Sequence, residues 1–180
     1  MSKVLQDEFH LTLRSGITIY PAQSKKINAA LADLLNRAPA QFVLLLDVTG
    51  QVISSLGQQE QVDLVSLGSL VAGDLAASHE IARLTNQYQA NQLVLREGQN
   101  THTFILEAGQ YLALFVQISD EVPLGWARML IQQVARQLTE IVAQPPDDVG
   151  DLKNRSDLQP ALNDALPDLF DDALDELWQE

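Results

Sequence analysis

The sequence predicts an α+β fold: a five-stranded antiparallel sheet with helices on both faces, in the order helix, two strands, helix, three strands, helix. Three observations predict it. A dense apolar run at 41–48 (QFVLLLDV) is typical of a buried strand, and the later β-prone runs are joined by links of hairpin length. Three other segments carry apolar residues at helical spacings of three and four.

The N-terminal half contains a hairpin signal, a helix and a strand pair. Short β-prone runs at 9–13 and 17–20 flank Arg14-Ser15-Gly16, which predicts a small hairpin. Ser24 is a plausible N-cap for a helix that ends at Pro39. The 41–48 strand turns at Thr49-Gly50 into a second strand at 51–56.

The C-terminal half of the predicted fold begins with a long helix. Asp63 is expected to cap this helix, which reaches about Asn86. Three strands and a last helix follow, at 92–97, 101–107, 110–118 and 124–142.

The 63–86 helix has an unusually broad apolar face beside a ridge of small residues. The ridge contains Gly68, Ala72 and Ala76 and is continued by His79 and Arg83. Glycine inside a helix costs about 1 kcal/mol relative to alanine, so Gly68 and Gly73 suggest close approach by another backbone. That backbone belongs either to the domain's own sheet or to a second subunit or partner.

Composition and charge exclude several functional classes. The 180 residues are 46% hydrophobic, with 11 basic and 24 acidic side chains and a net charge of −13. Such acidity makes a nucleic-acid binder or an anionic-membrane binder unfavourable. No cysteine is present, which removes disulfides and thiolate metal sites. No apolar run is long enough to span a membrane and no signal peptide is evident, so we expect a cytoplasmic protein.

A change of composition at Pro145-Pro146 predicts a domain boundary. We expect an N-terminal extension at 1–23, one domain at 24–144 and an acidic tail at 145–180, which holds 11 acidic and 2 basic residues. The tail also repeats apolar residues at helical spacing, among them Leu166, Phe170, Leu174 and Trp178. It is either a disordered acidic segment or a helix that docks on a partner or on its own domain.

Catalytic motifs are not found. Asp47-Val48-Thr49-Gly50 has the D-x-x-G form of magnesium-binding loops in GTPases, but the sequence has no phosphate-binding P-loop and a hairpin turn explains the motif. His10, His79 and His102 are scattered, without metal-ligand spacing. We therefore expect no catalytic residue, no metal and no cofactor, and a protein that is not an enzyme.

The pattern resembles the Roadblock/dynein-light-chain family, and within it the bacterial MglB-like proteins. The resemblance is carried by residues 42–53 (FVLLLDVTGQVI), the small-residue-rich helix at 63–86, and the strands containing 93–98 (LVLREG) and 111–116 (YLALFV). It covers about residues 24–142 and is one of pattern, since no single residue is diagnostic.

The resemblance implies a homodimer whose sheets join and whose middle helices lie side by side, with Gly68, Ala72 and Ala76 at the contact. It also implies an adaptor that binds a small Ras-like GTPase of the MglA kind and stimulates its GTP hydrolysis without supplying an arginine finger. His79 and Arg83 are our candidates for contact with this partner.

Two alternatives remain open at this stage. A roadblock domain can be a scaffold with no effect on hydrolysis. A profilin-, PAS- or GAF-like sensory domain also places helices on an antiparallel sheet, but it needs a ligand cavity of several hundred Å³.

Overall fold

The computed structural model describes residues 10–58, 62–87 and 92–144. The chain divides into a unit of residues 1–144 and a unit of residues 145–180, and the described residues all belong to the first. The sequence interpretation of the 145–180 tail, including Leu166, Phe170, Leu174 and Trp178, therefore lies outside the described residues.

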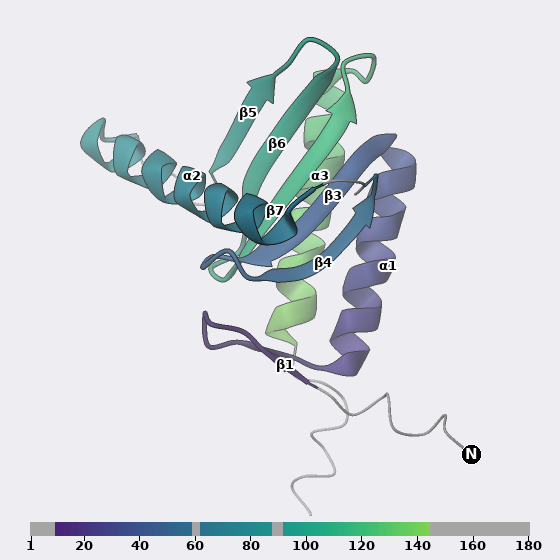
Figure 1. Cartoon of the computed structure of the whole chain (residues 1–180), viewed down its shortest axis with the longest axis vertical. Coiled ribbons are helices and arrows are strands. Elements are labelled where there is room, and N and C mark those ends of the chain that lie inside the picture. Colours follow the sequence, from purple (N-terminus) through teal and green to yellow (C-terminus); the bar gives the residue numbers. More distant parts are fainter. Residues whose placement is uncertain (1–9, 59–61, 88–91, 145–180) are drawn as a thin grey trace, which may run out of the picture. The chain divides into compact units, whose positions relative to one another are not determined.

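The core of the domain is a five-stranded antiparallel sheet in the order β4-β3-β7-β6-β5 (Figure 1). This confirms the predicted fold class. The strands are β3 (Ala40–Asp47), β4 (Val52–Gly57), β5 (Leu93–Glu97), β6 (Thr101–Ala108) and β7 (Leu112–Ser119). The central pair, β3 and β7, is covered on both faces, which explains why β3 is apolar at nearly every position instead of alternating.

Helices cover both faces of the sheet. The helices α1 (Pro21–Arg37) and α3 (Leu124–Ala143) lie on one face, and α2 (Leu64–Leu84) crosses the other (Figure 1). The α1/α3 side holds the larger apolar cluster, which includes the fully buried Leu31, Leu45 and Leu114. The α2 side holds a smaller cluster in which Val71 and Leu75 pack with Ile105 and Phe115.

The predicted N-terminal hairpin is present as β1 (Leu11–Thr12) and β2 (Thr18–Ile19). Leu13 and Ile19 anchor it in the larger cluster. The hairpin is therefore part of the domain, although the sequence analysis assigned it to a separate extension.

The start of α1 differs from the prediction. The helix begins at Pro21, so Ser24 lies inside it and is not the N-cap. Proline is well suited to the first helical position because its missing N–H would have no intrahelical partner there. Gln23 completes the cap, since its Oε1 accepts the backbone N–H of Tyr20 at 3.0 Å.

Gln23 also ties α1 to the end of α3. Its side chain is 5% exposed, and Nε2 donates to the carbonyl oxygens of Ile141 at 3.0 Å and Gln144 at 2.8 Å. These carbonyls belong to the last turn of α3, where no intrahelical N–H is available to them. One glutamine thus satisfies backbone groups at two helix ends.

The D-x-x-G segment forms the turn between β3 and β4, as the hairpin interpretation requires. Asp47 is fully buried, and its Oδ1 accepts hydrogen bonds from the N–H groups of Thr49 and Gln51, both at 2.9 Å. Its Oδ2 accepts the N–H of Ser15 at 3.1 Å, which joins the N-terminal hairpin to this turn. The carboxylate is thus a structural group that holds two turns together.

Candidate partner-binding surface on α2

Helix α2 begins as the sequence predicts. Asp63 is the N-cap, and its Oδ1 accepts the N–H groups of Val65 at 3.1 Å and Ser66 at 3.2 Å. The hydroxyl of Ser66 donates to Asp63 Oδ2 at 2.6 Å. These bonds fix the start of the helix at Leu64.

The close backbone approach at Gly68 is made within the chain. A Cβ atom on Gly68 would lie 2.4 Å from the carbonyl oxygen of Gly50, a separation that real Cβ atoms essentially never show. Gly68 is also buried. Of the two explanations for this glycine, packing on the domain's own hairpin is therefore sufficient.

The outward face of α2 carries an apolar stripe that the sequence analysis did not separate from the buried face. We define the stripe as Leu70, Gly73, Ala77, Ile81 and Leu84, which recur at spacings of three and four. Leu70 is 71% exposed, Ile81 62% and Leu84 67%. Around Gly73, an added Cβ would meet nothing within 4 Å. Clustered exposure of large apolar side chains marks an interaction surface.

The structure separates the residues of the sequence-predicted ridge. Ala72 is half-buried and Ala76 is exposed, whereas Gly68 points into the domain. His79 turns toward the sheet, with Nε2 2.7 Å from Glu107 Oε1. Arg83 is exposed and pairs with Glu80 one turn earlier, with Nε donating to Oε2 at 2.8 Å. Ala76 and Arg83 are therefore the ridge positions that a partner can reach most easily.

A groove of about 510 Å³ runs between α2 and strands β5–β7. Its floor includes Ile105 and Phe115, and Leu70 forms part of its wall. At its rim, Arg96 donates to Asp74 at 2.7 Å, which links β5 to α2. The groove therefore offers an apolar floor with a charged rim.

Strand β5 is an edge of the sheet. Among the described strands it pairs with β6 alone. The N–H of Gly98 donates to the carbonyl of Thr101, and the N–H of Glu107 donates to the carbonyl of Gln92. In an antiparallel pair such bonds recur at every second residue, so the even-numbered residues of β5 direct their backbone groups at β6. The backbone groups of Leu93, Leu95 and Glu97 consequently point outward and can accept another strand.

A metal site, a sensory ligand site and a membrane span each require particular features of the described residues. Within residues 10–58, 62–87 and 92–144, no three histidine, aspartate or glutamate side chains come together as a metal site. The centre of the space between the sheet and helices α1 and α3 is filled by fully buried side chains such as Leu31, Leu45 and Leu114, and a pocket of about 390 Å³ opens at its edge, beside the last turn of α3. In the part of the chain that the structure describes, no helix has the length and apolarity needed to cross a membrane.

Comparison with known proteins places the chain in a family. The Roadblock/LC7 domain model matches residues 26–117. The solved structure of Myxococcus xanthus MglB is 36% identical, with a TM-score of 0.60, and the match covers 64% of this chain and 94% of that one. An MglB from Thermus thermophilus is 22% identical, covers 72% of this chain and 98% of its own, and shares the fold at a TM-score of 0.64.

A further MglB structure, described as having a tetrameric arrangement, shares the fold at 23% identity and a TM-score of 0.65 and covers 72% of this chain and 97% of its own. A comparison with curated proteins finds no significant match. Because the family model spans half of the sequence, the resemblance noted from the sequence is confirmed. The chain belongs to the Roadblock/LC7 family and is similar to MglB proteins.

Proposed function

We propose that this chain is a homodimeric adaptor that binds a small Ras-like GTPase of the MglA kind and stimulates its GTP hydrolysis. The observation that carries the proposal is the exposed apolar face of α2. Membership of the Roadblock/LC7 family and the 36% identity to an MglB support it.

In this proposal, two neighbouring strips of α2 bind different partners. The stripe from Leu70 to Leu84 contains large apolar side chains around small ones, which suits a permanent contact with a second copy. The outward backbone of β5 would add strand pairing to the same dimer. The second strip, which we call the Ala76–Arg83 strip, is smaller and more polar. Such a surface suits a transient interaction.

This division revises the residues that the sequence suggested. Ala72 and Ala76 were candidates for the dimer contact, together with Gly68. We now propose the Leu70–Leu84 stripe for the dimer, and the Ala76–Arg83 strip for the GTPase. His79 then acts as a support, because it is held against Glu107 of β6.

Ala76→Arg tests the GTPase assignment. We expect this substitution to abolish stimulation of GTP hydrolysis, because a long charged side chain would stand between α2 and its partner. The dimer should persist, since Ala76 lies outside the stripe. Single-turnover hydrolysis by a purified MglA-type GTPase, titrated with the variant, gives the stimulation, and light scattering gives the oligomeric state.

Ala29→Arg is the matched control, because Ala29 is also an exposed helical alanine but lies on α1. Arg83→Ala should weaken binding of the same GTPase without changing the fold. Unchanged stimulation by both Ala76→Arg and Arg83→Ala would remove this strip from the proposed interface. Binding without any stimulation by the wild-type chain would favour the scaffold alternative.

The 145–180 tail enters this proposal as a second contact with a partner. Its apolar residues at helical spacing, within an acidic sequence, fit docking to an apolar groove rimmed by basic residues on the partner. Leu174→Asp combined with Trp178→Ala should weaken partner binding as much as truncation after residue 144. Calorimetric titration of the three proteins measures this, and equal affinities would reduce the tail to a solubilising segment.

A further inference from the structure

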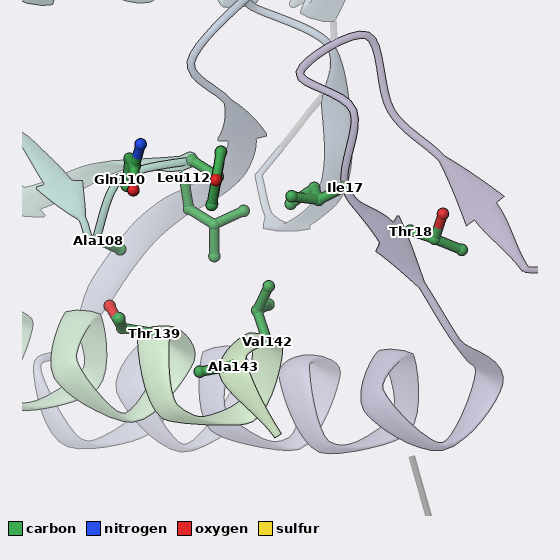
Figure 2. Close-up of a pocket in the computed structure, with 9 residues that line it drawn as sticks. Ile17, Thr18, Ala108, Gln110, Leu112, Thr139, Val142 and Ala143 are labelled. Carbon is green, nitrogen blue, oxygen red and sulfur yellow. The ribbon is translucent and has the colours of Figure 1, made fainter. Parts of the chain in front are cut away.

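A further cavity takes no lining residue from α2 or β5. It measures about 390 Å³ and opens where β2, the β6–β7 turn and the last turn of α3 meet (Figure 2). Ile17, Leu112 and Val142 converge on it, and Leu112 and Val142 point toward one another across the space (Figure 2). Its volume falls in the range of pockets that hold small ligands.

The lining of this cavity is apolar with a few neutral hydrogen-bonding groups. Leu112 is 1% exposed and Ala108 2%, so they belong to its floor. Thr139 also lines it, and the Thr139 hydroxyl already donates to the carbonyl of Ala135 at 2.9 Å. Because its proton is used, the Thr139 oxygen is available to a ligand as an acceptor.

The lining also restricts the charge of any ligand. All nine lining residues are described, and none carries a carboxylate, an ammonium or a guanidinium group. A buried charge without a partner is strongly unfavourable, so a charged molecule gains little from entering. Thr18, Gln110 and Tyr111 add neutral hydrogen-bonding groups to the lining, so the chemistry favours a neutral molecule with an apolar body and a hydroxyl group, which can both donate and accept.

We propose that this cavity binds a small uncharged aromatic or alkyl alcohol, with its hydroxyl donating to Thr139 Oγ1. The site is separate from the proposed dimer and GTPase surfaces, because α2 and β5 contribute no lining residue. It also depends on flanking elements of this chain, since Ile17 and Val142 lie outside residues 26–117 that match the family. A negative result for this site would therefore leave the proposed function unaffected, and the reverse also holds.

The test is an NMR titration of the full-length chain with benzyl alcohol, followed through the backbone amide signals of Ile17, Leu112 and Val142. We expect saturable shifts confined to the residues around the cavity. Benzoate, which has the same ring but a negative charge, should bind at least about tenfold more weakly, consistent with the cost of an unpaired buried charge. Toluene should also bind more weakly, because it has no donor for Thr139.

Three variants make the assignment specific. Ala143→Phe places a ring in the cavity from an exposed position at the end of α3, and should abolish the shifts; Ala29→Phe, on the exposed side of α1, should leave them intact. Thr139→Val keeps the shape of the side chain and should erase the preference for benzyl alcohol over toluene. The site is overturned if the full-length chain shows no saturable shift, if Ala143→Phe binds like the wild type, or if benzoate binds as well as benzyl alcohol.

Discussion

Replacing Asp47 with alanine is expected to lower the free energy of unfolding by about 3 kcal/mol, because each buried donor left without its acceptor carries a desolvation cost. Asp47 is 0% exposed and accepts the N–H groups of Ser15, Thr49 and Gln51 as well as the hydroxyl of Thr49, at 2.7 Å. The substitution leaves all of these donors without their acceptor. Urea denaturation at pH 7, followed by circular dichroism, measures the loss.

Asp33→Ala is the matched control for this prediction. Asp33 pairs with Arg37 at 3.0 Å on the exposed face of α1, one turn apart. Exposed pairs at this spacing contribute about 0.3–0.5 kcal/mol, so the control should be nearly neutral. Equal destabilisation by the two substitutions would show that the Asp47 network contributes nothing special to the fold.

The same carboxylate gives the fold a pH dependence. Burial disfavours the charged form and by itself would raise the pKa of Asp47, but hydrogen bonds from Thr49, Gln51 and Ser15 outweigh burial and hold the pKa below its ordinary value of 3.8. A carboxyl group with a depressed pKa in the folded state stabilises the fold above the pKa of the unfolded chain. That stability is lost as the pH falls through the lower pKa of the folded state.

We therefore expect the wild-type free energy of unfolding to fall as the pH drops below about 4, the ordinary pKa of aspartate. Asp47→Asn should show a smaller fall over that interval, because asparagine does not titrate. Parallel urea denaturation series from pH 7 to pH 3 give the comparison. Identical pH profiles for the two proteins would contradict the assigned role.

Gly73→Leu is expected to dissociate the proposed dimer while leaving each protomer folded. A side chain on Gly73 meets nothing within 4 Å in the protomer, and glycine inside a helix costs about 1 kcal/mol relative to residues with high helix propensity. The isolated protomer should therefore gain stability. Between two copies, the added leucine would occupy the space that lets the helices approach.

Two other glycines serve as controls for Gly73. A side chain on Gly125, in the first turn of α3, also meets nothing within 4 Å, so Gly125→Leu should leave the dimer intact. Gly68→Ala should instead destabilise the protomer by about 1–3 kcal/mol, because its Cβ would collide with the backbone of Gly50. Light scattering and thermal denaturation on the three variants separate loss of assembly from loss of folding. A Gly73→Leu protein that remains dimeric would place the contact elsewhere.

The elements that the sequence predicted well are those specified by local signals. Asp63 caps α2 because its side chain reaches N–H groups two and three residues later, and this needs no tertiary contact. The 41–48 run and the hairpin links likewise gave five strands whose limits differ from the structure by about two residues at most. The family resemblance rested on the order of these elements, and the comparisons confirm it.

The first residue of α1 could not be predicted from local sequence signals alone. Ser24 is a suitable N-cap and Pro21 is a suitable first helical residue, and the helix begins at Pro21. With this start, the Gln23 side chain hydrogen-bonds both the N–H of Tyr20 and the carbonyl of Ile141 at the end of α3. The partner of Gln23 is more than 100 residues away in the chain. Sequence spacing carries no information about such a contact.

The sequence by itself determined that this chain is an α+β roadblock domain with a capped, broadly apolar middle helix. Only the tertiary structure decided which arc of that helix is buried. A broad apolar arc fits several orientations, and the choice depends on the β3–β4 turn, which brings Gly50 against Gly68 and fixes the rotation of α2 over Ile105 and Phe115. That rotation turns Leu70, Ile81 and Leu84 outward, because the sheet offers apolar contact on one side of the helix.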